Sequence, residues 1–193
     1  MAYAILLPGS ADCTPKKMLP MRLFLIGMPG AGKTTLGRAL ATLYALPFLD
    51  LDEEIVRQEQ RSIPEIFEAE GEDYFRQREA AMLREVVQQQ PRLVLATGGG
   101  TPCFHNNLAV LLQEGLTIYL HVPVEKLARR LRSEMAARPL LSHLPDAAAL
   151  QQQLLETLSR REQFYERAPL RCTGSGCSPE AVSHLISRFL TTG

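Results

Sequence analysis

Eight residues near the start of the chain have the types and spacing of a phosphate-binding loop. Residues 27–34 read Gly-Met-Pro-Gly-Ala-Gly-Lys-Thr and match the pattern G-x-x-x-x-G-K-[ST]. In such a loop the glycines let backbone N–H groups turn toward phosphate oxygens, the lysine lies along the β- and γ-phosphates, and the threonine hydroxyl binds Mg²⁺. The predicted nucleotide contacts are Gly30, Ala31, Gly32, Lys33, Thr34 and Thr35, and Thr34 is also a predicted metal ligand.

The surroundings of this loop support the same interpretation. The apolar run 23–26 precedes it and a repeat of apolar residues at helical spacing follows it, as the motif requires. A chance match to the motif is expected on the order of once in a hundred chains of this length. A phosphate-binding loop does not by itself separate a kinase from a GTPase, an ATPase or a regulator. The guanine-reading motif N-K-x-D does not occur in the sequence, so we expect ATP.

Two aspartates follow the second apolar run. Asp50 and Asp52 are two residues apart, so in extended backbone both carboxylates point to the same side of the strand. Beside a phosphate site, one carboxylate can hold Mg²⁺ through water while the other accepts a hydrogen bond from a substrate hydroxyl. A solvated acidic start of a helix, stabilised by the helix dipole, explains the same two residues equally well.

The elements that must position these residues alternate between strand and helix. Strands are expected at 23–26, 48–50, 93–97, 116–122 and 170–173. Helices are expected from Thr34 to about Ala45, up to Arg61, from Ser62, at 73–89, around 127–131, at 150–165 and after Ser178. Prolines interrupt the pattern at 134–147, where we expect a mobile loop. This alternation predicts a parallel sheet with helices on both faces.

Five further motifs occur in the order and approximate spacing seen in shikimate kinases. They are Phe-Leu-Asp-Leu-Asp at 48–52, Gly-Glu-Asp-Tyr-Phe-Arg at 71–76, Ala-Thr-Gly-Gly-Gly at 96–100, Arg-Pro-Leu-Leu at 138–141 and Arg-Glu-Gln-Phe-Tyr at 161–165. The chain resembles this family from about residue 21 to its C-terminus. The resemblance implies a three-layer α/β/α P-loop kinase fold with a five-stranded parallel sheet in the order 2-3-1-4-5, and a mobile lid at about 134–147.

The resemblance also implies a role for each matching residue. Asp52 is expected to hold the 3-hydroxyl of shikimate, and Asp50 to bind Mg²⁺ through water. Lys33, Asp52 and the lid residue Arg138, which reaches the transferring phosphate, are the expected catalytic residues. The other implied contacts are Arg76 and Arg161 with the shikimate carboxylate and Gly98, Gly99 and Gly100 with the substrate. On the nucleotide side, Arg130 or its neighbour Arg129 is expected near adenine, and Pro179 is expected to contact the nucleotide from the adenine-side loop.

Simpler explanations exist for several of these residues. Arg76 can pair with Glu72 or Glu79 on its own helix, and Arg161 can pair with Glu162 or Glu166. The joint occurrence of the motifs favours the substrate-binding interpretation over these pairs. His105 is interpreted as the start of a helix or a surface residue, and Cys103 as a small buried residue, because phosphoryl transfer to a hydroxyl requires little base strength.

Composition limits the remaining possibilities. With 193 residues and 46% apolar residues, a single folded domain over residues 21–193 is expected, preceded by a flexible extension at 1–20 in which Met18, or Met21 just after it, is a candidate start. Lys and Arg total 21, as do Asp and Glu, so we expect neither a nucleic-acid nor a membrane partner. The four cysteines lack metal-site or disulfide spacing, which predicts reduced thiols and a cytoplasmic location. We also expect a monomeric enzyme.

The predicted reaction is transfer of the γ-phosphate of ATP to the 3-hydroxyl of shikimate, giving shikimate 3-phosphate and ADP, a step of chorismate and aromatic amino acid biosynthesis. Two alternatives stay open at this point. One is a different small-metabolite kinase on the same fold, such as a gluconate kinase or a nucleoside-monophosphate kinase. The other is a nucleotide-binding module without transferase activity.

Overall fold

The computed structural model describes residues 22–134, 147–174 and 177–192. The predicted extension at 1–20, nearly all of the predicted lid and its Arg138 lie outside these ranges. Within the described ranges, none of the helices combines the length and the apolar character that crossing a membrane requires.

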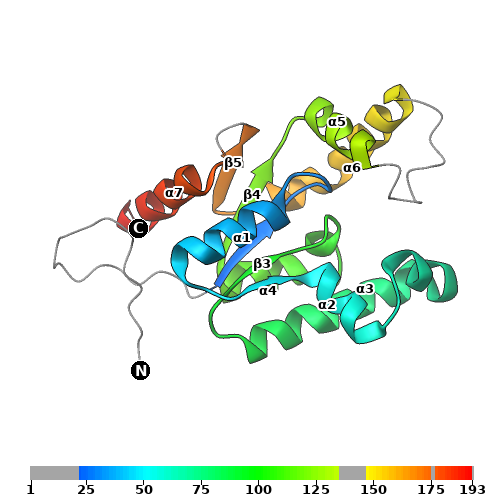
Figure 1. The fold of residues 1–193 in the computed structure, drawn as a ribbon, viewed down its shortest axis with the longest axis horizontal. Coiled ribbons are helices and arrows are strands. Elements are labelled where there is room, and N and C mark those ends of the chain that lie inside the picture. The colour runs from blue at the N-terminus through cyan, green and yellow to red at the C-terminus, as the bar shows by residue number, and fades with distance from the viewer. Residues whose placement is uncertain (1–21, 135–146, 175–176, 193) are drawn as a thin grey trace.

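Five parallel strands form the centre of the molecule (Figure 1). They are β1 (Arg22–Ile26), β2 (Phe48–Asp50), β3 (Leu93–Ala96), β4 (Leu116–His121) and β5 (Leu170–Thr173). The sheet order is β2-β3-β1-β4-β5, which confirms the predicted fold class and strand order. In the register of β1, Leu23 lies between Val94 of β3 and Leu116 of β4, so β1 is the central strand.

Helices cover both faces of this sheet. The helix α1 packs against α7 on one face, while α4 contacts both α3 and β4 on the other (Figure 1). A short 3-10 helix, η1 (Thr101–Cys103), follows β3. The α-helices are α1 (Lys33–Tyr44), α2 (Leu51–Glu59), α3 (Ile63–Gln89), α4 (Asn107–Glu114), α5 (Val124–Glu134), α6 (Ala147–Tyr165) and α7 (Pro179–Thr192).

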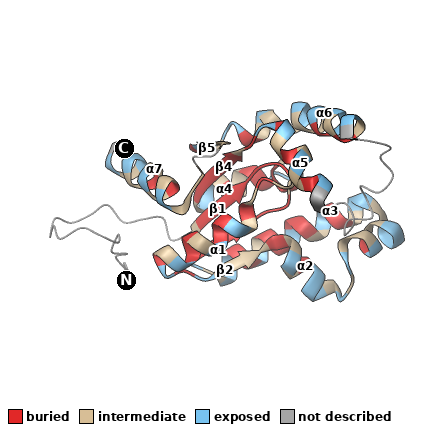
Figure 2. Ribbon diagram, turned by 45° about the horizontal axis from the view of Figure 1, so that its top comes forward, coloured by how far each residue is buried: buried red, intermediate tan, exposed pale blue. Residues whose placement is uncertain are grey.

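The strands themselves make up the centre of the hydrophobic core (Figure 2). Leu25, Ile26, Leu95 and Ile118 have no exposed surface. These continuous apolar runs suit strands that are covered by helices on both faces. The turns that follow the strands are therefore attached to the buried core.

A glycine divides α3 into two parts. Its first part begins with a capping box, since Ser62 Oγ accepts from the Glu65 backbone N–H while Glu65 Oε2 accepts from the Ser62 N–H. At Gly71 the backbone has φ 83° and ψ 176°, a conformation that glycine adopts without steric cost. The second part, which carries Arg76, therefore takes its own direction beside the sheet.

All the turns that contain predicted site residues leave the same edge of the sheet. The phosphate-binding loop follows β1, Asp50 ends β2 and the glycine triplet follows β3. Because the strands are parallel, their carboxyl ends meet at one edge, where ligands bind in open α/β sheets.

Candidate active site

The phosphate-binding loop has the conformation that its glycines permit. Gly30 and Gly32 have φ of 76° and 95°, which are left-handed values, and Gly32 is the N-cap of α1. Lys33 is only 8% exposed, and its Nζ donates to the Gly27 and Met28 carbonyl oxygens at 2.9 and 3.0 Å. The loop thus encloses a positive charge beside the N-terminus of a helix, an arrangement suited to phosphate.

The two aspartates are placed by a turn and not by an extended strand. β2 ends at Asp50 and α2 begins at Leu51, so the prediction that both carboxylates project from one strand is wrong. Asp50 Oδ1 instead accepts from the Asp52 N–H at 3.1 Å and caps α2. Asp52 lies in the first helical turn, and both residues nevertheless line the same cleft.

A hydroxyl and a carboxylate suited to Mg²⁺ lie next to the loop. Thr34 Oγ1 donates to Asp50 Oδ2 at 2.7 Å. Mg²⁺ prefers oxygen ligands and usually keeps several waters while it binds substrate phosphates, so it needs few protein groups. The described residues contain no cluster of three or more His, Cys, Asp or Glu that would form a complete protein cage. Thr34 and Asp50 therefore fit a magnesium ion shared with a nucleotide.

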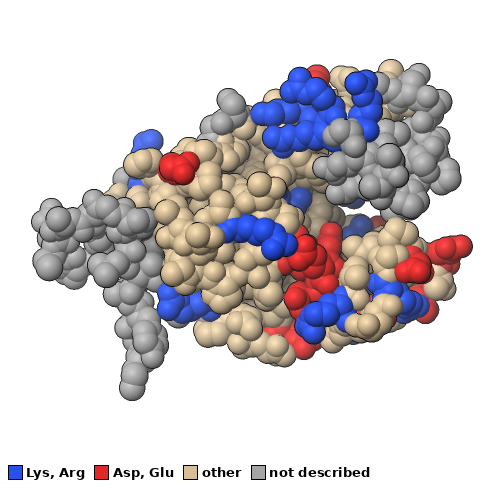
Figure 3. All heavy atoms as spheres, viewed as in Figure 1, with Lys and Arg blue, Asp and Glu red and all other residues tan. Residues whose placement is uncertain are grey.

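These residues surround a cleft of about 830 Å³. Figure 3 shows basic side chains over α5 and acidic side chains over α2, on the two sides of the recess. Twelve of the predicted site residues line the cleft: Gly30, Ala31, Gly32, Lys33, Thr34, Thr35, Asp50, Asp52, Gly98, Gly99, Arg130 and Pro179.

Asp52 has an acceptor atom that the protein does not use. Within the described part of the chain, Asp52 Oδ1 is enclosed and has no hydrogen-bond partner. Burial, followed by the nearby carboxylates of Glu79 and Asp50, raises the pKa of Asp52 to about 6, while Lys33 and Arg76 oppose the shift. Asp52 is therefore ionised at neutral pH, and as a residue that lines the cleft it supplies a charged acceptor there.

The first and last glycines of the triplet pack against the predicted acceptor groups. A Cβ on Gly98 would lie 2.8 Å from Glu79 Oε1 and 2.9 Å from Asp52 Oδ1. A Cβ on Gly100 would lie 2.8 Å from Arg76 Nη1. Any side chain at these two positions would displace the carboxylates or the guanidinium, so the absence of a Cβ lets them converge on the turn.

The middle glycine joins the acceptor side to the phosphate-binding loop. A Cβ on Gly99 would lie 2.7 Å from Pro29 Cδ and 3.2 Å from Arg161 Nη1. Arg161 thus reaches the turn from α6, although among the described residues neither Arg161 nor Arg76 lines the cleft itself. Glu166, which the sequence offered as a partner for Arg161, instead pairs with Arg171 at 3.4 Å.

Arg76 is held by a carboxylate that sequence reasoning did not assign to the site. Its Nη1 donates to Glu79 Oε2 and its Nη2 to Glu72 Oε1, both at 3.0 Å, so the pairing within one helix is present. Glu79 has no exposed surface, and its Oε1 accepts from Thr101 Oγ1 at 2.5 Å. The ion pair therefore fixes the Arg76 guanidinium beside the glycine turn. The three-residue spacing between Arg76 and Glu79 is the signal in the sequence. From the sequence alone, this pair is an alternative to substrate binding by Arg76.

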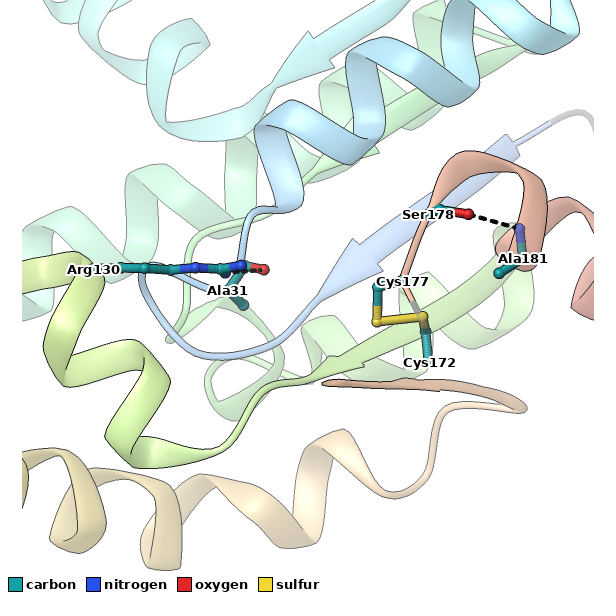
Figure 4. The surroundings of a disulfide bond; sticks show 6 residues. All are labelled: Ala31, Arg130, Cys172, Cys177, Ser178 and Ala181. Carbon is teal, nitrogen blue, oxygen red and sulfur yellow. Dashed lines mark hydrogen bonds between the residues drawn. A yellow bond between two sulfur atoms is a disulfide. The ribbon is translucent and has the colours of Figure 1, made fainter. Parts of the chain in front are cut away.

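The opposite end of the cleft is formed by α5 and α7. Arg130 Nη1 donates to the Gly30 carbonyl oxygen at 3.1 Å and to the Ala31 carbonyl oxygen at 3.2 Å. Figure 4 shows the second of these contacts. Arg130 lines the cleft, whereas Arg129 is exposed and is absent from the lining within the described ranges. Lys126, which sequence reasoning missed, also lines this end.

A disulfide lies on the α7 side of the cleft, and it corrects the expectation of reduced thiols. Cys172 of β5 is bonded to Cys177, which lines the cleft, and their Cα atoms are 5.5 Å apart (Figure 4). The spacing of five residues has no recognised pattern, because whether two cysteines can pair depends on how closely the fold brings their Cα atoms. After this bond the chain enters α7, which Ser178 caps by accepting from the Ala181 N–H at 3.2 Å.

The two residues that sequence reasoning set aside as candidates have ordinary surroundings. His105 is exposed and lies just before α4, and its carbonyl accepts from Arg84 Nη2 at 2.8 Å. Cys103 is a free thiol whose pKa is raised by burial, which makes it a poor nucleophile.

Comparisons with known proteins agree with this geometry. The family model described as shikimate kinase matches residues 29–191. A shikimate kinase from Parabacteroides distasonis is 39% identical over 169 residues, which is 88% of this chain and 96% of that protein. The structure of a shikimate kinase from Acinetobacter baumannii in complex with shikimate is 38% identical with a TM-score of 0.78, over 91% of this chain and 95% of that one. A gluconokinase from Sinorhizobium meliloti, 17% identical with a TM-score of 0.50 over 90% of this chain and 93% of that one, shares the fold alone.

Proposed function

This chain belongs to the shikimate kinase family, and from that premise we propose that its cleft holds ATP on the phosphate-binding loop and shikimate against the glycine triplet. The chain is an ATP-dependent kinase that transfers the γ-phosphate to the 3-hydroxyl of shikimate, giving shikimate 3-phosphate and ADP. The single observation that carries the site assignment is the convergence on one turn of an unpartnered Asp52 oxygen and two guanidinium groups, from Arg76 and Arg161.

The acceptor side suits a hydroxylated carboxylic acid. An arginine guanidinium can bind a planar carboxylate through two parallel hydrogen bonds. We assign this contact to Arg76 and Arg161, which approach the glycine turn from α3 and α6. The Asp52 carboxylate, which lines the cleft, would then accept a hydrogen bond from the 3-hydroxyl and orient the hydroxyl oxygen toward the nucleotide. Asp52 takes the proton late in the transfer, since this chemistry needs positioning more than base strength.

The phosphate side provides electrostatic stabilisation. The Lys33 ammonium neutralises negative charge that spreads over the transferring group, and the backbone N–H groups of the loop hold the other phosphates. Thr34 and Asp50 would hold Mg²⁺, which when bound offsets the charge of the phosphates. Arg138 and most of the lid lie outside the described residues, so their contact with the transferring phosphate stays a prediction.

The alternatives are weaker for definite reasons. Gluconate also carries a carboxylate and hydroxyls, so the arginines alone do not separate the two acceptors. The gluconokinase shares only the fold with this chain, whereas shikimate kinases match it over nearly its whole length. A module that only binds nucleotide has no use for an enclosed carboxylate with a free acceptor atom, since burying an unpaired charge is costly.

The other expectations are proposed with the function. The substrates are small molecules, and we propose that residues 21–193 act as one unit with a lid at about 134–147, as a monomer in the cytoplasm. Sedimentation of the purified chain tests the monomer, and a dimer that persists on dilution would contradict it.

A panel of acceptors tests the reaction. ADP release from Mg·ATP is measured with shikimate, gluconate and nucleoside monophosphates, and mass spectrometry identifies the phosphorylated product. We expect turnover with shikimate at least about 100-fold above the other acceptors, and loss of turnover in Asp52→Asn, which removes the oriented acceptor. Preferred turnover of gluconate or a nucleotide, or nucleotide binding without any product, would sink the proposal.

A further inference from the structure

Tyr165, the last residue of α6, contacts three parts of the proposed site at once. It has no exposed surface, and its hydroxyl donates to the Gly99 carbonyl oxygen at 2.5 Å. The Tyr165 hydroxyl oxygen also lies 3.8 Å from Met28 Sδ in the phosphate-binding loop. Its ring stacks on Tyr119 of β4, with centroids 5.1 Å apart. The side chain is therefore held rigidly, with its one polar atom at the junction of both loops.

The direction of the hydrogen bond follows from the groups around the hydroxyl. Burial raises the pKa of Tyr165, with the Arg161 guanidinium opposing the shift, so the phenol keeps its proton. The Arg161 guanidinium lies near this hydroxyl as well as near Gly99. A carbonyl only accepts, so the protonated Tyr165 hydroxyl is the donor to Gly99.

The Gly99 peptide needs such an anchor. Three consecutive glycines have more conformational freedom than any other tripeptide, and without restraint they would populate many backbone geometries. Pro29 and Arg161 enclose the α-carbon of Gly99 and limit its translation. Neither contact determines the rotation of its peptide plane. The hydrogen bond from Tyr165 does, because it specifies where the carbonyl points.

We propose that Tyr165 is a positioning residue for the acceptor substrate. The Tyr165 hydroxyl sets the orientation of the glycine turn beside Arg161. This inference deepens the proposed function and rests on it. A tyrosine that served the fold alone would change stability on truncation and leave substrate affinities as they were. A positioning residue changes mainly the kinetics of shikimate, because the short hydrogen bond of the hydroxyl is to the glycine turn, whereas its contact with the loop that holds ATP is only to the Met28 sulfur at 3.8 Å.

The test compares two buried tyrosines. Tyr165→Phe removes the hydroxyl and keeps the ring. Tyr44→Phe is the matched control, since Tyr44 is 3% exposed, donates to Ser183 Oγ at 2.8 Å and belongs to no part of the site. Leaving a buried carbonyl without its donor costs a factor of roughly 5 to 150 in an equilibrium. We therefore expect Tyr165→Phe to lower kcat/KM for shikimate by about 10-fold or more, mainly through KM, with KM for ATP within about 2-fold.

The control should lose a comparable amount of thermal stability while both KM values stay within about 2-fold of those of the parent chain. A folded Tyr165→Phe protein with an unchanged KM for shikimate overturns the proposal, as does an equal rise of both KM values. Incorporation of 4-aminophenylalanine at position 165 restores an N–H donor, also where Tyr165→Phe does not fold. We expect it to return KM for shikimate to within about 3-fold of the parent value, and failure to do so in folded protein also counts against the proposal.

Different results would contradict the proposed function and the role of Tyr165. If the unmodified chain does not phosphorylate shikimate, the proposed function is wrong. If the unmodified chain is active and Tyr165→Phe matches it, the function stands and only the role of Tyr165 is lost.

Discussion

Ionised Asp52 destabilises the folded protein. Its pKa of about 6 lies above the ordinary value of 3.8, so the folded chain binds this proton more tightly than the unfolded chain does. The stabilisation from the protonated form is complete below about pH 4 and is lost as the pH rises through about 6. Above that pH the ionised carboxylate lowers the free energy of unfolding by about 3 kcal/mol. Such a cost is typical of a group that is retained for chemistry.

Replacing this carboxylate should therefore stabilise the protein while it removes activity. In nucleotide-free and metal-free solution, we expect Asp52→Asn to raise the free energy of unfolding at pH 8 by up to about 3 kcal/mol, with little difference near pH 4. Urea titrations across this pH range measure the effect. Asp73→Asn, at an exposed position of α3, is the control and should change little at either pH. Equal free energies of unfolding for Asp52→Asn and the parent chain at pH 8 would show that the ionised Asp52 carboxylate does not destabilise the fold.

Lys33 allows a sharper test of the phosphate side. Its ammonium is almost enclosed by the loop, so a neutral side chain of similar length cannot replace its charge. We expect Lys33→Met to lower kcat by at least about 100-fold, because the charge acts on the transferring group. Arg129→Met removes one exposed positive charge from α5 and should keep kcat within about 3-fold. Near-normal turnover of Lys33→Met would remove this lysine from the catalytic set.

At the scale of elements, the site depends on where helices begin and turn. Gly71 breaks α3, so its second part directs Arg76 and Glu79 toward the glycine turn. Asp50 ends β2 and caps α2, which places Asp52 in the first turn of the helix. The same residue thus stops a strand, starts a helix and lies within hydrogen-bond distance of Thr34.

The connection from β5 to α7 is an element held by a covalent bond. A cross-link across a loop of this length is expected to stabilise the fold by about 2 kcal/mol, through the entropy removed from the unfolded chain. For a chain of this size, reductant should lower Tm by roughly 4–8 °C. The double variant Cys172→Ser, Cys177→Ser should show no response to reductant, whereas Cys103→Ser should keep it. Thiol titration shows whether both cysteines are reduced. If they are reduced and Tm is unchanged, the disulfide does not contribute to stability.

At the scale of the whole molecule, the parallel sheet brings distant segments together. The loop after β1, the turn after β2 and the glycines after β3 leave neighbouring strands at one edge, while α6 adds Arg161 and Tyr165 from the far end of the chain. Nucleotide and acceptor can therefore face each other across a single cleft without a second domain. The family resemblance predicted this arrangement because strand order follows from topology, which related chains share.

The sequence by itself determined the five strands, the nucleotide loop and most of the helices, although the expected helices include neither η1 nor a range for α4. All five strands lie within one residue of their predicted bounds, and helices begin at Ser62 and after Ser178 as expected. Apolar periodicity, caps and glycines are local signals, so they can be interpreted without the rest of the chain. The order of the strands and the candidate acceptor residues came from the resemblance, since no local pattern encodes them.

Only the tertiary structure decided which polar groups meet. The enclosed oxygen of Asp52, the pairing of Glu79 with Arg76, the choice of Arg130 over Arg129 at the cleft, and the disulfide were all missed or left open. Tyr165 and Gly99 are 66 residues apart, and their contact exists because α6 packs beside the turn after β3. Burial and hydrogen bonding between distant residues depend on the packed chain as a whole, and for this reason the sequence predicted the elements of the site but not its electrostatics.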